Sequence, residues 1–253
     1  MLTTLLGGRA FAERYGEPPA SVVALHGWGR TRADFATTLE GFDALALDLP
    51  GFGATPAPDE GWSTGEYAEW LRECLEDAAR QGSDRPVVVG HSFGGRVAVR
   101  LAAANPQLVR GIVLSGVPLL RPQAAASKPP LGFRAMRFLN KWHFISNERM
   151  EQERRKRGSA DYLAAQGVMR EVLVKAVNED YGDALDVLAT SGLPVTMVWG
   201  EHDTAARATM AEQARARIGS SAELVVVPGS GHLLDDALAA ALRTAIVEQA
   251  ASS

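Results

Sequence analysis

The segment VVVGHSFGGRVAV, residues 87–99, contains a serine in the surroundings expected of an activated nucleophile. A run of valines leads into Gly90, Ser92 follows two residues later, and Gly94 precedes an apolar, helix-like stretch. A G-x-S-x-G sequence between a strand and a helix holds its serine on a strained turn, where the hydroxyl is exposed and small neighbours let strand and helix pass closely. The pattern predicts that Ser92 is a nucleophile, but such short patterns also arise by chance.

Two phosphate-binding interpretations of this loop fail on residue types. A Walker loop needs a lysine and a hydroxyl after its last glycine, whereas Arg96 and Val97 follow Gly95. Neither GHSFGG nor PGFGATP has the G-x-G-x-x-G spacing of a dinucleotide-binding turn. The remaining alternative to a nucleophile is a tight turn that happens to contain a serine.

A serine hydroxyl needs a base to take its proton, and the base needs a third group to orient it. On a nucleophile turn of this kind the partners follow in the order serine, acid, histidine. Of the five histidines, His232 in GSGH best fits the base, and Asp203 in EHD, directly after the strand-like PVTMVWG, best fits the acid. Glu201 is a distant second acid. The alternative is a surface aspartate and a turn histidine without a catalytic role.

Two backbone N–H groups are expected to stabilise the oxyanion that forms during acyl transfer. The first belongs to Phe93, the residue after the nucleophile, and the second to Trp28 in the HGWG loop. The Trp28 side chain could equally fill the core. His26, His91 and Asp48 are expected to have structural roles, Asp48 by holding its own loop with hydrogen bonds.

These residues can meet only if separate strands end at one edge of a sheet. Short apolar runs alternate with helical patterns, which is typical of a parallel sheet covered on both faces. Residues 118–187 interrupt the alternation with a proline-rich start and helical patterns, and we interpret them as a helical cap over the carboxyl edge. The expected division is a first core segment (1–117), the cap (118–187) and a second core segment (188–253). Strands are expected at 2–6, 11–15, 21–25, 44–47, 87–89, 111–114, 194–200 and 223–228, and helices at 64–80, 94–104, 204–218 and 233–249.

Composition narrows the class of protein. The 253 residues are 46% hydrophobic, enough for a sizeable core, and no stretch approaches the ~20 apolar residues of a membrane span. A net charge of −4 argues against nucleic acid as a partner. The single cysteine, Cys74, lies on an apolar helix face and suits a reducing cytoplasm. The N-terminus does not resemble a signal peptide. We therefore expect a cytoplasmic protein with no metal, cofactor, nucleic-acid or membrane partner.

The cap has a net positive charge on an otherwise acidic chain. If its basic side chains face the pocket mouth, they would attract an anionic substrate or an acidic carrier protein. The alternative is a solvated helix surface with glutamates interleaved among the basic residues. The basic residues concerned are Arg134, Arg137, Lys141, Arg149, Arg154, Arg155, Lys156 and Arg157.

Together, LHGWG, DLPGFG, GHSFGG, WGEHD and GSGH resemble the α/β-hydrolase superfamily in order and spacing, over nearly the whole chain. The resemblance implies an α/β-hydrolase fold, with a mostly parallel eight-stranded sheet and a helical cap after the sixth strand. It also implies Ser92 as nucleophile, Asp203 and His232 as its partners, and Trp28 with Phe93 as the oxyanion hole. Within the superfamily, LHGWG followed by DLPGFG is most similar to small bacterial carboxylesterases, including pimeloyl-acyl carrier protein methyl ester esterases.

The expected function is hydrolysis of a carboxylic ester of a small or medium acyl substrate through an acyl-enzyme. The same triad could instead cleave a C–C bond, open a lactone or transfer an acyl group. A different class of protein, a small-molecule receptor with little turnover, can also retain these residues.

Overall fold

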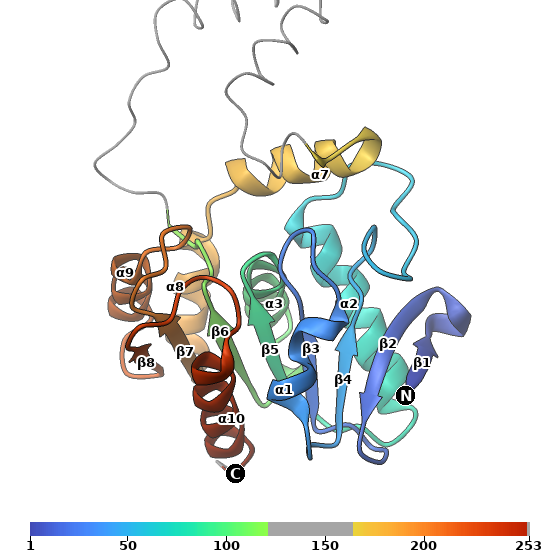
Figure 1. Ribbon diagram of the computed structural model, residues 1–253, viewed down its shortest axis with the longest axis horizontal. Coiled ribbons are helices and arrows are strands. Elements are labelled where there is room, and N and C mark those ends of the chain that lie inside the picture. Colours follow the sequence, from blue (N-terminus) through green and yellow to red (C-terminus); the bar gives the residue numbers. More distant parts are fainter. Residues whose placement is uncertain (121–163, 252–253) are drawn as a thin grey trace, which may run out of the picture.

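The computed structural model describes residues 1–120 and 164–251, in which the chain forms an eight-stranded sheet flanked by helices (Figure 1). The strands are β1 (Leu2–Leu5), β2 (Ala10–Tyr15), β3 (Val22–Leu25), β4 (Ala44–Leu47), β5 (Val87–His91), β6 (Gly111–Ser115), β7 (Val195–Gly200) and β8 (Ala222–Val227). The helices are α1 (Ala36–Leu39), α2 (Thr64–Ala79), α3 (Phe93–Ala104), α7 (Gly167–Asn178), α8 (Gly182–Ser191), α9 (Ala208–Ile218) and α10 (Asp236–Ala251), with short 3-10 turns η1 (Leu6–Gly8), η2 (Arg32–Phe35) and η3 (Pro106–Leu108).

The strands lie in the order β1-β2-β4-β3-β5-β6-β7-β8. β1 and β2 pair antiparallel, as do β2 and β4, whereas every pairing from β4 through β3 to β8 is parallel. This topology confirms the predicted mostly parallel sheet of eight strands. It also brings the carboxyl ends of β3, β5, β6 and β7 to one edge.

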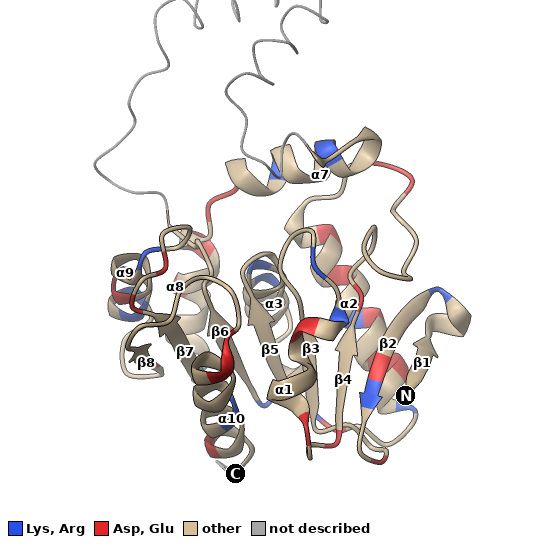
Figure 2. Ribbon diagram, viewed as in Figure 1, with Lys and Arg blue, Asp and Glu red and all other residues tan. Residues whose placement is uncertain are grey.

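Helices cover both faces of the sheet, which explains why its central strands are apolar throughout (Figure 2). Every residue of β3, β4, β5 and β6 is buried. On one face, α2, α3, α8 and α9 pack against Val23, Leu25 and their neighbours. On the other, α1 and α10 pack against Val22, Val87 and Val89. Within the described ranges, no helix is both long and apolar enough to cross a bilayer.

Two helices begin later than their apolar patterns predicted. α9 starts at Ala208 and not at residue 204, because the Asp203 carboxylate accepts the N–H groups of Ala205 and Ala206 in a turn that precedes the helix. α10 starts at Asp236 and not at residue 233, because the Asp235 carboxylate accepts the Leu238 N–H and so caps the first turn. In both cases an aspartate side chain accepts backbone N–H groups at or just before the start of the helix, so the helix need not extend further toward the N-terminus.

Much of the expected cap, including all of its basic residues from Arg134 to Arg157, lies outside the described residues. Its described end forms α7, which lies across the carboxyl edge of the sheet in Figure 1. The expected boundary at residue 187 falls inside α8, a helix that packs against α3 and α9 of the core layer. The division of the chain into cap and core segments therefore stays a prediction.

One side chain of α3 holds the chain on both sides of the insertion. Arg96 donates from Nε to the carbonyl of Pro118, 3.2 Å away, and from Nη1 to the carbonyl of Ala176, 2.8 Å away. The first carbonyl lies where the chain leaves the core after β6, and the second lies near the end of α7. A partly buried carboxylate reinforces this junction, since Glu179 accepts the Thr64 N–H at the start of α2 at 3.0 Å.

Candidate active site

Ser92 occupies a strained turn between β5 and α3. Its backbone angles, φ 49° and ψ −110°, lie in a region that a residue with a side chain rarely adopts. Such a conformation costs about 1–3 kcal/mol and persists only where the surrounding structure enforces it. Here the Ser92 N–H donates to the carbonyl of Ser115 at the end of β6, 2.9 Å away.

Glycines make this turn possible because strand and helix pass with almost no space between them. A Cβ on Gly90 would lie 2.5 Å from the Cα of Gly95, and one on Gly94 would clash with the carbonyl of Leu25 at the end of β3. The Gly94 N–H also donates to the carbonyl of His26 at 3.1 Å. The G-x-S-x-G spacing therefore has the steric basis that the sequence predicted.

Asp203 and His232 form a hydrogen-bonded pair at the same edge of the sheet. His232 Nδ1 lies 2.8 Å from Asp203 Oδ2. Asp203 follows β7 and is 4% exposed, and its other oxygen accepts the two N–H groups of the turn that precedes α9. An imidazole that donates its Nδ1 hydrogen to a carboxylate keeps its lone pair on Nε2, as a general base requires.

Contacts with neighbouring residues place this pair close to the turn that carries Ser92. Gly116 follows the residue that binds the Ser92 N–H, and a Cβ on it would lie 3.0 Å from His232 Nδ1 and 3.1 Å from Asp203 Oδ2. The ring of His91, the residue before Ser92, has its centroid 5.0 Å from that of His232. The His232–Asp203 pair is therefore close to residues on either side of the turn that carries Ser92.

The two predicted oxyanion donors lie in neighbouring loops. Residues 27–30 form a turn closed by a hydrogen bond from the Arg30 N–H to the Gly27 carbonyl, 3.2 Å, with Gly29 at φ 67°. This is the geometry of a type II turn, in which the N–H of the second residue, here Trp28, is not used by the turn itself. Phe93 is the first residue of α3, so its N–H has no partner within that helix.

Aromatic rings line this part of the edge. The Trp28 ring meets the rings of Phe52 and Phe93 edge to face, with centroids 5.0 and 5.3 Å apart. Trp28 and Phe52 are only partly buried, and both pack against the main core together with Met169 of α7. An apolar wall therefore adjoins the two loops that carry the predicted oxyanion donors.

His26 and Asp48 have the structural contacts expected from the sequence. His26 Nε2 accepts the Leu49 N–H at 3.0 Å, and burial lowers the pKa of this histidine. Asp48 is fully buried, accepts the N–H groups of Arg32 and Ala54 at 2.9 and 2.8 Å, and forms an ion pair with the Arg32 guanidinium. Both residues fix the loops on which Trp28 and Phe52 stand.

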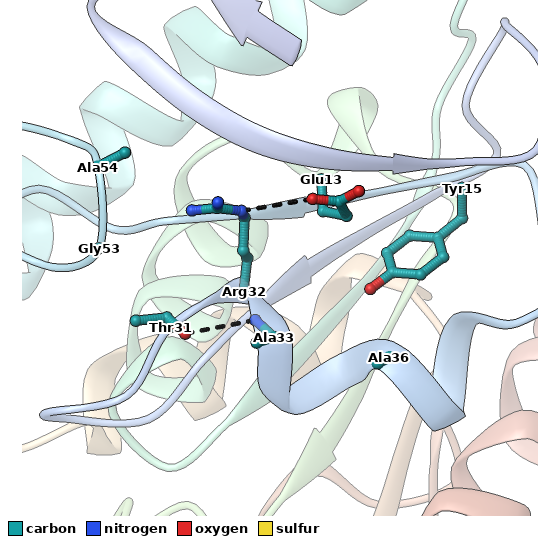
Figure 3. A pocket seen from close by; sticks show the side chains of 8 residues that line it. All are labelled: Glu13, Tyr15, Thr31, Arg32, Ala33, Ala36, Gly53 and Ala54. Atoms are coloured by element: carbon teal, nitrogen blue, oxygen red, sulfur yellow. Dashed lines mark hydrogen bonds and ion pairs between the residues drawn. The ribbon is translucent and has the colours of Figure 1, made fainter. Parts of the chain in front are cut away.

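A cavity of about 480 Å³, whose lining does not include Ser92, opens beside the loop held by Asp48 (Figure 3). In the close view the Arg32 guanidinium points toward the Glu13 carboxylate, 3.7 Å away. Arg32 therefore links Glu13 to Asp48 along the wall of this cavity. The lining residues are Glu13, Tyr15, Thr31, Arg32, Ala33, Ala36, Gly53 and Ala54.

The sequence analysis did not place two residues beside the His232–Asp203 pair, although the structure does. Gly116 contacts both His232 and Asp203, and the only signal for it was its position directly after a buried strand. His91 was expected to be structural, yet its ring packs beside His232. Side chains alternate between the two faces of a strand, so His91 lies on the same face of β5 as Val87 and Val89. α10 covers that face, and this pattern could have indicated the side of the sheet on which His91 lies.

Known proteins share this sequence pattern and fold. The sequence model of the Alpha/beta hydrolase family matches residues 22–243. The lipase LipV of Mycobacterium tuberculosis is 41% identical over 108 residues, which cover 40% of this chain and 39% of LipV. A pimeloyl-acyl-carrier-protein methyl ester esterase of Salmonella heidelberg is 31% identical over 105 residues, 40% of this chain and 38% of that protein. The matched part is less than half the length of these curated relatives.

Solved structures extend the similarity to the whole fold. A hydrolase from Pseudomonas aeruginosa superposes with a TM-score of 0.69 at 20% identity, over 100% of this chain and 98% of that one. A bacterial membrane phospholipase A superposes with a TM-score of 0.71 at 17% identity, over 100% of this chain and 86% of that one. At these identities the structures show a common fold. Since the family's sequence pattern covers most of the chain as well, the protein belongs to the alpha/beta hydrolase family.

Proposed function

We propose that this protein is a serine hydrolase that cleaves carboxylic esters, with Ser92 as nucleophile, His232 as general base and Asp203 as the group that orients it. The observation that carries the proposal is the 2.8 Å His232–Asp203 pair beside a serine at φ 49°. A strained serine and a carboxylate-bound histidine are the two parts that acyl transfer needs close together.

In the first half of the reaction, Ser92 Oγ attacks the ester carbonyl carbon while His232 Nε2 takes the hydroxyl proton. The carbonyl oxygen becomes an oxyanion, and the N–H groups of Phe93 and Trp28 donate to it. When the tetrahedral intermediate collapses, the alkoxide leaves and takes the proton from His232. Asp203 stays ionised throughout and stabilises the imidazolium that forms in between.

In the second half, water attacks the acyl group on Ser92 while His232 again takes a proton. The intermediate expels Ser92 Oγ, which regains its hydrogen from His232, and the carboxylic acid departs. Each step reuses the same base and the same two donors, so no further side chain is required.

The substrate class we propose is an ester with an apolar acyl group of small or medium length. The partly exposed rings of Trp28 and Phe52, with Met169 of α7, would offer that group an apolar wall beside the oxyanion donors. Similar proteins include a lipase and a methyl ester esterase, which supports ester chemistry.

The same three residues could carry out reactions other than ester hydrolysis, and these are the alternatives to the proposal. An acyl acceptor other than water would make the protein an acyltransferase, and a cyclic ester would make it a lactonase. C–C bond cleavage would use the same triad, whereas a receptor would bind without turnover. A cytoplasmic location and an acidic carrier protein as a source of substrate also remain proposals.

A series of p-nitrophenyl esters of increasing acyl length tests the proposal. The wild type should hydrolyse short and medium esters, and Ser92→Ala should lose at least ~10³-fold in kcat/KM. The matched control is Ser220→Ala, which removes an exposed serine just before β8, at the opposite edge of the sheet. A fluorophosphonate should label the wild type on the peptide that contains Ser92.

Wild-type rates in Ser92→Ala would refute the nucleophile assignment. Labelling of Ser92 without hydrolysis of any ester would instead favour one of the other acyl chemistries or a receptor. Rapid hydrolysis at all pH values from 5 to 8 with unchanged kcat/KM would contradict a histidine base, because only a neutral imidazole can accept the serine proton.

A further inference from the structure

His91 is a buried histidine that the proposed reaction does not use. It is the last residue of β5 and is 2% exposed. Within the described part of the chain, its Nδ1 makes no hydrogen bond of normal geometry. A buried polar atom without a partner destabilises a fold, and an apolar residue at the end of this strand would avoid that loss. The presence of histidine here therefore calls for an explanation.

The ring of His91 is close to two parts of the candidate site. Its centroid is 5.0 Å from that of the His232 ring, with the planes inclined by 47°. A Cβ on Gly27, in the loop that carries Trp28, would lie 3.1 Å from His91 Cδ2. His91 thus packs against both the proposed base and the proposed oxyanion loop.

The other contacts described for His232 are at one end of its ring. Asp203 Oδ2 lies 2.8 Å from Nδ1, and a Cβ on Gly116 would lie 3.0 Å from Nδ1 and 3.1 Å from Cε1. The ring of His91 is a further neighbour, with its centroid 5.0 Å from that of His232. Removal of the His91 ring would therefore take away a packing contact of the imidazole and leave its hydrogen bond to Asp203 as the main restraint.

The charge state of His91 suits a place beside a base that becomes positive. Burial, and then the proximity of His232, lower the pKa of His91 to about 4, although Asp34, the Ser115 carbonyl and Asp203 act in the opposite direction. His91 is therefore uncharged in the neutral range. A neutral ring does not oppose the imidazolium that His232 forms when it takes the serine proton, as a lysine or arginine would.

We propose that His91 is a positioning residue, whose buried ring packs against the imidazole of His232 and holds it on Asp203 at a fixed spacing from the oxyanion loop. The inference rests on the proposed function, because it assigns His91 a role toward the base of that reaction. His91 touches neither the ester nor the attacking oxygen in this role. Its effect is to keep the base in the orientation from which proton transfer occurs.

The test compares His91→Ala, which removes the ring, with His91→Gln, which keeps an uncharged polar side chain of similar reach. His202→Ala is the matched control, since it removes an exposed histidine from the loop that carries Asp203. We expect His91→Ala to lower kcat for a p-nitrophenyl ester by ~10–100-fold with KM changed less than about twofold. His91→Gln should recover a large part of this loss, and the control should keep the wild-type values.

A second readout does not depend on ester turnover. The proton shared by His232 Nδ1 and Asp203 should give a downfield NMR resonance in the wild type, in His91→Gln and in the control. In His91→Ala this resonance should broaden or disappear, while circular dichroism and cooperative thermal unfolding show that the variant is folded. If His91→Ala does not fold, the same comparison is made on His91→Gln, where a smaller loss of kcat and a weaker resonance are expected.

The two proposals fail in different ways. No hydrolysis by the wild type, with a downfield resonance that His91→Ala abolishes, would overturn the ester hydrolase proposal and support the role of His91. A wild-type kcat in His91→Ala, or a reduced kcat with an unchanged resonance, would overturn the positioning role while leaving the hydrolase proposal intact.

Discussion

The buried, uncharged state of His91 makes a quantitative prediction about stability and pH. The pKa of His91 is lowered from 6.5 to about 4 in the folded protein, first by burial and then by His232. The unfolded chain therefore binds a proton at this residue at a pH where the folded protein does not. By linkage, the free energy of unfolding must fall as the pH falls from 6.5 toward 4, and this loss is complete only below pH 4.

The size of the effect follows from the two pKa values. A shift of this size is equivalent to about 3.4 kcal/mol when the pH is well below both values. Integrated with the linkage relation, the loss is about 0.2 kcal/mol at pH 7, about 0.8 at pH 6 and about 2 at pH 5. His91 alone should therefore make the wild type about 1.8 kcal/mol less stable at pH 5 than at pH 7.

Urea unfolding of the wild type and of His91→Gln at pH 7, 6 and 5 measures this contribution. Glutamine does not titrate, so the difference in free energy of unfolding between the two proteins should change by about 1.8 kcal/mol from pH 7 to pH 5. Titrating groups that do not interact with His91 are common to both proteins and cancel in this difference. His202→Ala, which removes a surface histidine, should follow the wild-type pH dependence. Parallel curves for the wild type and His91→Gln would refute the argument, since they would mean that His91 binds a proton as readily in the folded state.

Three further substitutions test other parts of the structure. Asp203→Asn should lower kcat by about 10²–10⁴-fold, because it leaves the imidazole in place with the wrong tautomer. If Asp203→Asn kept the wild-type kcat and Glu201→Gln lost activity, Glu201 and not Asp203 would be the acid. Gly94→Ala should destabilise the protein by about 1–3 kcal/mol in urea unfolding, because its Cβ would clash with a carbonyl at the end of β3, and wild-type stability would contradict this packing. Asp48→Asn should lower the free energy of unfolding by about 3 kcal/mol, since it leaves the Arg32 guanidinium without its buried counter-charge; a change below about 1 kcal/mol would show that the pair is not needed.

The sequence predicted the sheet and the order of its elements well because both depend on simple periodicities. Short runs that are apolar at every position, such as residues 44–47 and 111–114, are typical of strands in a sheet that is covered on both faces. The pairing of Asp203 with His232 at the edge that also carries Ser92 was predictable for the same reason, since residues that follow parallel strands meet at one edge. These inferences needed no knowledge of side-chain direction.

Features that depend on individual side chains were less accessible. The first turns of α9 and α10 were predicted too early, because an apolar pattern does not show that Asp203 and Asp235 bind the N–H groups in front of each helix. The contact between His91 and His232 was missed because the strand pattern was taken to end at Val89, two residues before β5 does. Extending the strand to residue 91 would have fixed the face on which His91 lies. The short helix α1 has too few residues for a recognisable period.

The two carbonyls held by Arg96 have a consequence for tolerance to changes in chain length. Because one guanidinium binds the carbonyls of Pro118 and Ala176, both points are held on α3, the helix that begins directly after Ser92. With its two ends held in this way, doubling the length of the chain that joins them would add only about 0.6 kcal/mol of loop-closure entropy. We therefore expect insertions between these two points to change the free energy of unfolding little, and replacement of Arg96 to change it more.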